Sequence, residues 1–204
     1  MNNMNRTNLS LNYYQFGPII AAYLLPDSII SELRVRGKQT NLDHRHSLAG
    51  HIEKENAFSK EDKEWFINNT SNIFQVYLDL LIDKCITKDK KPQSLQLSNL
   101  WINFMKNGDF NPPHNHDGDI SFVIYTSVPN ELKEENDAFK GRSAGPGTIE
   151  FLYGESNKSY RTAYSFLPKT GDMFLFPASL RHFVSPFKSD ITRESVSGNI
   201  YFTY

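Results

Sequence analysis

The spacing of apolar residues predicts two helices in the first half of the chain. Residues 25–37, LPDSIISELRVRG, carry apolar residues at helical spacing, with helix-start residues before them and Gly37 after them as a stop signal. Residues 59–85 show the same period over a longer stretch, and Ser59 stands three residues before Asp62, which is a weak capping box. Apolar faces of this kind pack on a core, so we assign them no chemistry.

From residue 96 the pattern changes to that of β-strands. Short segments rich in aromatic and β-branched residues alternate with Gly, Pro, Asn or Asp. The predicted strands lie in QLSNLWINFMKNGDF, ISFVIYTSVP, GTIEFLYG, YRTAYSFLP, GDMFLFP, HFVSPF and SVSGNIYFTY. Two segments without this pattern are predicted as loops: the histidine-bearing residues 41–55, and the charged, glycine-ended residues 130–147, which we expect to be mobile. The pattern predicts an α+β, mainly β, fold in which helices pack on a double-sheet β core.

Length and composition favour one folded unit with a large core. The chain has 204 residues, and we expect a single domain, with a helical support region in residues 1–95 and a β core in residues 96–204. Its 15 Phe and 10 Tyr suit a β-rich core. The 22 basic and 23 acidic residues leave a formal charge of −1, so no global field attracts nucleic acid or an anionic membrane. Neither is therefore expected as a partner.

Cysteine content and the distribution of apolar residues bear on the compartment. The single cysteine, Cys85, excludes an internal disulfide and fits a reducing compartment, and its neighbours LLIDKCITK predict a buried or half-buried thiol at a helix end. No apolar run reaches 18 residues, and the polar start MNNMNRTNLS lacks the apolar core of a signal peptide. These features predict a soluble, cytoplasmic protein. They carry no information on its oligomeric state.

The stretch PPHNHDGD, residues 112–119, is a candidate metal-binding segment. On an extended chain, His114 and His116 would point to the same face, where two imidazoles can share one ion. The prolines stiffen the approach, and Asp117-Gly118 makes a tight turn beyond. Taken alone, the stretch is better interpreted as a polar hairpin tip. A metal site needs a further ligand elsewhere in the chain.

That ligand is offered by the segment GDMFLFPASLRHFVSPF near the end of the chain. The turn Gly171-Asp172 precedes an apolar strand that ends at Phe176-Pro177. His182 follows after four intervening residues, at the start of the next predicted strand. At this position the third histidine can face the first pair across a barrel.

Eleven residues later, the strand RESVSGNIYF places Arg193, Ser195 and Ser197 on one face. A cation and hydroxyls on an inward face are costly unless something anionic neutralises them, and the planar fork of arginine suits a carboxylate. The alternative is that Arg193 lies at a strand edge and pairs with Asp190 or Glu194.

Together these motifs resemble the 2-oxoglutarate- and Fe(II)-dependent oxygenases, and among them the type frequent in bacteriophage and marine bacterial genomes. The resemblance runs from Trp101 to Phe202, about half the chain, through WINFMKNGDFNPPHNH, SFVIYTSVP, LPKTGDMFLFPASLRHFVSP and RESVSGNIYF. Each motif is weak by itself, but four in the right order are fairly specific. The resemblance implies a double-stranded β-helix (jelly-roll) core buttressed by the N-terminal helices.

The resemblance also implies roles for individual residues. His114 and His182 would be Fe(II) ligands, and Arg193 would bind the distal carboxylate of the cosubstrate 2-oxoglutarate with help from Ser195. Further candidates for contact with the cosubstrate are Asn103, Tyr125 and Tyr153. The family would also use O2, and ascorbate could keep the metal reduced.

The third metal ligand departs from the family pattern. Most of the superfamily carries His-x-Asp, the first part of a two-histidine, one-carboxylate triad. Here the position two residues after His114 is His116, and a carboxylate follows only at Asp117. Spacing favours His116, a turn at Asp117 could still rotate that carboxylate inward, and a site with only His114 and His182 would resemble the aspartyl/asparaginyl β-hydroxylases.

The resemblance implies hydroxylation of an unactivated C–H bond with release of succinate and CO2. Its substrate would be peptidyl, for example prolyl, or a small molecule. Residues 130–147 and the segment with His44, His46 and His51 are the expected rim of the site. Two alternatives from other classes are a cupin-like metalloenzyme without 2-oxoglutarate, and a non-catalytic jelly-roll binding module.

Overall fold

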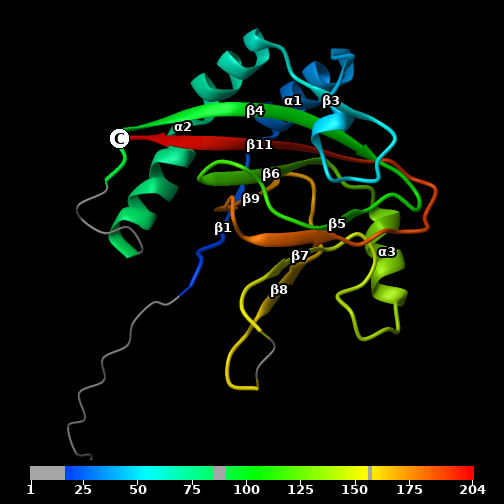
Figure 1. Cartoon of the computed structure of the whole chain (residues 1–204). Helices are drawn as coiled ribbons and strands as arrows, with labels where there is room; N and C mark the ends of the chain where they lie inside the picture. Colours follow the sequence, from blue (N-terminus) through cyan, green and yellow to red (C-terminus); the bar gives the residue numbers. More distant parts are fainter. Residues whose placement is uncertain (1–16, 85–90, 156–157) are drawn as a thin grey trace, which may run out of the picture.

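The computed structural model describes residues 17–84, 91–155 and 158–204, and Cys85 lies outside these ranges. Two antiparallel β-sheets form its centre (Figure 1). The larger sheet has the order β1 (Ala21–Leu24), β9 (Asp172–Pro177), β6 (Ile120–Ser127), β11 (Arg193–Thr203), β4 (Ser94–Met105), β3 (Glu55–Ala57), β2 (Leu42–Asp43). The smaller sheet has the order β5 (Asn111–His114), β10 (Arg181–Val184), β7 (Ile149–Leu152), β8 (Ala163–Phe166). This is the expected jelly-roll core of an α+β, mainly β, fold.

The helices cover one face of the larger sheet, and the smaller sheet faces the other. In Figure 1, α1 (Asp27–Gln39) and α2 (Lys60–Lys84) lie across β4 and β11 on the side away from β7 and β8. Strand β6 is buried on both faces: Phe122 and Ile124 belong to the core shared with the helices, and Val123 and Tyr125 to the core between the sheets. This follows from the alternation of side chains along a strand. The site therefore has a rigid, doubly packed wall.

The predicted capping box of the second helix is confirmed. The backbone N–H of Asp62 donates to the Ser59 hydroxyl at 3.1 Å, and the backbone N–H of Ser59 donates to the Asp62 carboxylate at 3.2 Å. Such reciprocal bonds satisfy donors that the first helical turn leaves without partners. No helix in the described ranges is long and apolar enough to cross a membrane.

The predicted end of the first helix is wrong. Gly37 does not stop α1, which continues to Gln39, and it is buried inside the helix. A Cβ at this position would lie 2.4 Å from Cδ1 of Ile102, so a glycine lets α1 approach β4 closely. The residue serves packing between elements, which spacing along the chain does not reveal.

The two segments predicted as loops contain regular structure. Residues 130–147 include α3 (Asn130–Ala138), which buries Leu132 fully. The Glu135 carboxylate accepts hydrogen bonds from the backbone N–H groups of Lys188 and Ser189 at 2.9 and 2.8 Å, so the helix is tied to the chain before β11. Residues 41–55 contribute β2, a 3-10 turn at Arg45–Ser47 and the first residue of β3, which extend the larger sheet. Tertiary pairing overrides weak local patterns in both segments.

Candidate metal and cosubstrate site

A row of polar side chains crosses four neighbouring strands of the larger sheet. The strand register places Glu55 of β3 opposite Asn103 of β4, Asn103 opposite Ser195 of β11, and Ser195 opposite Tyr125 of β6. Residues directly opposite one another share a face of the sheet, and all four line one cavity between the sheets. The cavity has an empty volume of about 530 Å³, including its opening to solvent.

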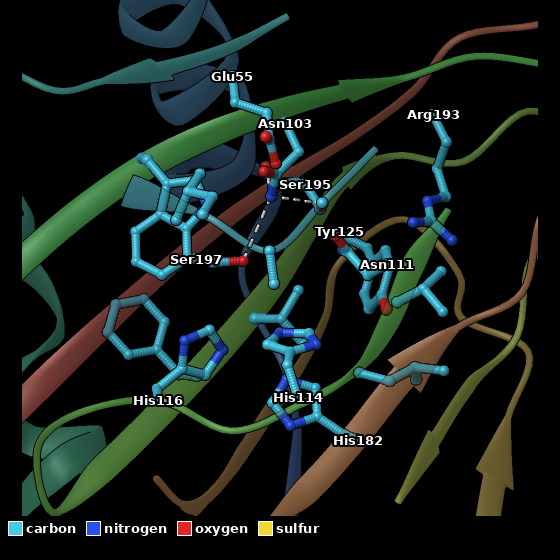
Figure 2. A pocket seen from close by; sticks show the side chains of 18 of the residues that line it. Glu55, Asn103, Asn111, His114, His116, Tyr125, His182, Arg193, Ser195 and Ser197 are labelled. Atoms are coloured by element: carbon cyan, nitrogen blue, oxygen red, sulfur yellow. Dashed lines mark hydrogen bonds between the residues drawn. The ribbon is translucent and has the colours of Figure 1, made fainter. Parts of the chain in front are cut away.

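Three histidines lie across the cavity from this row. His114 of β5 and His182 of β10 are direct cross-strand partners. His116 follows two residues after His114, and its backbone N–H donates to the carbonyl of Ala178 at 2.9 Å. The nitrogens that could bind a metal lie within 4.8 Å of one another, and the three rings converge in Figure 2. In the described ranges this is the one group of three or more His, Cys, Asp or Glu side chains placed to hold an ion.

Backbone hydrogen bonds orient two of these rings. Nδ1 of His114 lies 2.7 Å from the carbonyl oxygen of Pro112, and Nδ1 of His182 lies 2.9 Å from that of Leu180. A carbonyl only accepts, so Nδ1 carries the proton and donates. Nε2 is then left with its lone pair for a metal.

Burial keeps the three imidazoles neutral. It lowers the pKa of His116 to about 3 and that of His182 to about 4, with the neighbouring histidines adding to the effect. Burial lowers the pKa of His114 as well. Around His182, the rings of Phe176 and Phe151 have centroids 4.7 and 5.8 Å away. Neutral imidazoles in an apolar setting are suited to bind a cation.

Arg193 is a buried cation that has no anionic partner among the residues that the structure describes. It is 2% exposed, its guanidinium donates to the Gly147 carbonyl at 2.9 Å and contacts the Met105 sulfur at 2.8 Å, and Nε has no hydrogen-bond partner. Its guanidinium also lies over the Tyr125 ring, 5.3 Å from the centroid. Burial lowers its pKa. An isolated buried charge is costly, so this arrangement calls for an anion in the cavity.

The alternative explanation for Arg193, an ion pair at a strand edge, is wrong. Glu194 belongs to the opposite face of β11 and pairs with Arg34 at 2.7 Å and Lys38 at 3.5 Å. No ion pair joins Arg193 to Asp190 or Glu194 in the described part of the chain.

The remaining predicted residues divide into two groups. Asn103, Ser195 and Tyr125 line the cavity; the Asn103 amide nitrogen donates to the Ser195 and Ser197 hydroxyls at 3.3 and 3.4 Å. Burial raises the pKa of Tyr125 to about 12. Tyr153 does not line the cavity; it is 49% exposed beside a separate hollow.

The expected rim elements and the alternative carboxylate lie elsewhere. Asp117 is exposed and is not part of the histidine group. None of His44, His46 and His51 lines the cavity, although Leu48, Ala49 and Gly50 between them do. Residues 130–147 do not line it either; their contribution is the Gly147 carbonyl that accepts from Arg193.

Sequence reasoning missed two polar residues of the cavity, Glu55 and Asn111. Glu55 is 2% exposed, and Oε2 of its carboxylate has no hydrogen-bond partner within the described ranges. Burial, with a contribution from Asp109, raises its pKa to about 7. Glu55 opens a three-residue strand in a segment without strand alternation, so no signal in the sequence marked it. Asn111 lies next to the predicted histidine segment and could have been found by its position.

Comparison with known families agrees with the geometry. Residues 99–199 match the family described as "Putative 2OG-Fe(II) oxygenase", where 2OG is 2-oxoglutarate. Residues 99–199 belong to this family. The match includes all three histidines, Arg193 and Ser195. It also argues against a non-catalytic jelly-roll module and against a cupin-like enzyme without 2-oxoglutarate. The comparison with curated proteins found no match.

Solved structures share the fold of this oxygenase at low sequence identity. A viral collagen prolyl hydroxylase from Paramecium Bursaria Chlorella virus-1, in complex with 2-oxoglutarate, is 14% identical with a TM-score of 0.58, over 91% of this chain and 96% of that one. HygX from Streptomyces hygroscopicus, with nickel, 2-oxoglutarate and hygromycin B bound, is 8% identical with a TM-score of 0.57, over 90% and 82%. A prolyl hydroxylase from Trichoplax adhaerens, in complex with a hypoxia inducible factor peptide, is 14% identical with a TM-score of 0.54, over 92% and 83%.

Proposed function

We propose that this oxygenase hydroxylates an unactivated C–H bond of a peptidyl or small-molecule substrate and releases succinate and CO2. The observation that carries the proposal is the meeting of three neutral histidines and one unpaired buried arginine in a single cavity. Solved structures of the same fold include one with a peptide and one with hygromycin B, so the fold accommodates both substrate classes.

Fe(II) would be held by Nε2 of His114 and His182 together with His116. The convergence of these nitrogens fits one ion, and imidazole is a ligand that Fe(II) accepts. His116 is preferred to Asp117 because it belongs to the convergent group and Asp117 is exposed. When bound, Fe(II) and 2-oxoglutarate supply the oxidation: O2 is consumed, the cosubstrate becomes succinate and CO2, and a substrate C–H becomes C–OH.

Arg193 would bind the distal carboxylate of 2-oxoglutarate. Its unsatisfied Nε and its lack of an ion pair among the described residues leave a charge for that carboxylate to neutralise. A guanidinium offers two parallel N–H donors to a carboxylate, which fixes orientation as well as position. The hydroxyls of Ser195 and Tyr125 and the amide nitrogen of Asn103 lie along the same cavity wall and would complete the cosubstrate pocket. Tyr153 lacks such support because it lines another hollow.

Anaerobic binding tests the proposal directly. Fe(II) plus 2-oxoglutarate should give a weak visible charge-transfer band, and His182→Ala should remove it. Arg193→Ala should weaken 2-oxoglutarate binding about tenfold or more, the loss of a charge-assisted hydrogen bond, with little change in Fe(II) binding. Turnover assays should include ascorbate, which we expect to keep the metal reduced. Absence of both the band and calorimetric 2-oxoglutarate binding in the wild type would refute the proposal, and equal losses of metal and cosubstrate in Arg193→Ala would make that residue structural.

A further inference from the structure

The cavity holds a second buried ionisable group that has no ion-pair partner among the described residues, a carboxyl group. Glu55 lines the same cavity, and no cation lies within ion-pair distance of its carboxylate in the described ranges. Figure 2 shows Glu55 beside Asn103, on another part of the wall from Arg193. The cavity therefore presents a cation at one place and a carboxylate at another, and the two do not neutralise each other.

Acceptor oxygens gather around Glu55. Asn103 is the cross-strand partner of Glu55. Oε2 of Glu55 and Oδ1 of Asn103 are both buried, and neither has a hydrogen-bond partner in the part of the chain that the structure describes. The third oxygen is Oδ1 of Asn111. It lies near the Glu55 carboxylate, because a Cβ added to Gly50 would be 2.4 Å from Oδ1 of Asn111 and 3.0 Å from Oε1 of Glu55. Buried acceptors without a donor cost free energy, so this corner of the cavity calls for a donor-rich group.

The cosubstrate cannot supply that group. At neutral pH, 2-oxoglutarate carries two carboxylates and a keto oxygen, all of them acceptors, and its negative charge would repel an ionised Glu55. Arg193 already offers the place for an anion. A donor-rich group that the cosubstrate lacks points to the substrate, which is the other molecule that the reaction requires in this cavity.

We propose that Glu55, Asn103 and Asn111 bind a primary ammonium group, so that the substrate is an alkylamine. This inference rests on the proposed function. An ammonium group has three N–H donors and one positive charge, which match three acceptor oxygens and one carboxylate. The amine is either a free small molecule or a lysine side chain on a peptide, because both present the same group. The ammonium would also hold Glu55 ionised, since a nearby positive charge offsets the burial that raises its pKa.

Gly50 offers a way to disturb this corner without removing its carboxylate. Its φ is not in the left-handed region, so an alanine fits the backbone, but the added methyl would crowd the Asn111 and Glu55 oxygens. Gly50→Ala should therefore act like a mild form of Glu55→Gln.

Calorimetry on the full chain with Fe(II) and 2-oxoglutarate under anaerobic conditions tests the inference. The probes are free L-lysine, Nα-acetyl-lysine methylamide, and Nα-acetyl-norleucine methylamide, which keeps the carbon chain and lacks the ammonium. At least one lysine probe should bind and the norleucine probe should not. If only free L-lysine binds, the substrate is a small-molecule amine. If only the blocked probe binds, the substrate is a peptidyl lysine. If both bind, the site recognises the ammonium group that the two probes share. Glu55→Gln should weaken the ammonium probe about 10- to 150-fold, the range for a charge-assisted hydrogen bond, and Gly50→Ala should weaken it less.

The titration of 2-oxoglutarate into the same samples separates this inference from the proposed function. If 2-oxoglutarate binds and both lysine probes fail in the millimolar range, the ammonium site is wrong and the oxygenase proposal stands. Equal binding of lysine and norleucine probes, or unchanged lysine affinity in Glu55→Gln, would likewise overturn it. Should Glu55→Gln fail to fold, as judged by its melting curve, Gly50→Ala provides the same comparison.

Discussion

At the scale of single residues, His116 in place of a carboxylate changes the charge of the proposed metal site. A two-histidine, one-carboxylate triad brings one negative charge to Fe(II), whereas three neutral imidazoles bring none. The ion then keeps its full charge, and compensation falls to the dianionic cosubstrate. A surplus of positive charge at the metal and at Arg193 should favour anion binding, which fits the proposed binding of 2-oxoglutarate between the metal and Arg193.

His116→Ala should lower Fe(II) affinity by more than the roughly 10- to 100-fold typical of losing an outer-shell partner, because a direct ligand would be removed. Asp117→Asn is the matched control: the residue is adjacent and exposed, so we expect Fe(II) affinity within about twofold of wild type. Anaerobic metal titration with a competing chelator measures both. A larger loss in Asp117→Asn than in His116→Ala would reverse the assignment of the third ligand.

At the scale of elements, the strands were predictable and their partners were not. The period-two segments after residue 96 and the order of His114, His182 and Arg193 were visible in the sequence. Register joins residues far apart in the chain, such as His182 with His114, and only the folded sheets fix it. The sequence pattern did not reveal Glu55 as a residue of the cavity, because its strand is only three residues long. Gly37 was wrongly predicted to end the first helix, because its role depends on contact with another element.

Gly37→Ala should destabilise the protein even though alanine is the better helix former. Overpacking against the buried Ile102 costs about 1–3 kcal/mol, and the better helix propensity of alanine offsets about 1 kcal/mol of this cost. Because the added Cβ would lie 2.4 Å from Cδ1 of Ile102, we expect the upper part of the range, a net loss of about 1–2 kcal/mol in the free energy of unfolding. Val35→Ala, at a position 50% exposed on the same helix, should leave stability within about 1 kcal/mol of wild type. Adding Ile102→Val, which removes the crowded Cδ1, should recover part of the loss. Urea unfolding compares all four proteins, and a Gly37→Ala variant as stable as wild type would show that α1 and β4 leave room for a methyl group at this position.

At the scale of the whole molecule, the polar groups of the candidate site lower the free energy of unfolding when no ligand is bound. Arg193, Glu55 and Asn103 each place an unsatisfied polar atom in the interior, next to the wall shared by both cores. Each such atom costs about 1–3 kcal/mol until a partner arrives. Ligands that satisfy these groups should therefore stabilise the protein, by an amount set by their concentration relative to their Kd.

Arg193→Met makes this trade-off measurable. Methionine keeps an unbranched chain in the cavity and removes the buried charge, so without 2-oxoglutarate the variant should be about 1–4 kcal/mol more stable than wild type. With Fe(II) and 2-oxoglutarate at 100 times its Kd, the wild type should gain about 2.7 kcal/mol and the variant should gain little at the same concentration. Arg142→Met, at an exposed position, is the control and should change neither quantity by more than about 0.5 kcal/mol. If Arg193→Met is less stable than wild type in the absence of 2-oxoglutarate, its bonds to Gly147 and Met105 outweigh the cost of the buried charge, and the arginine stabilises the fold.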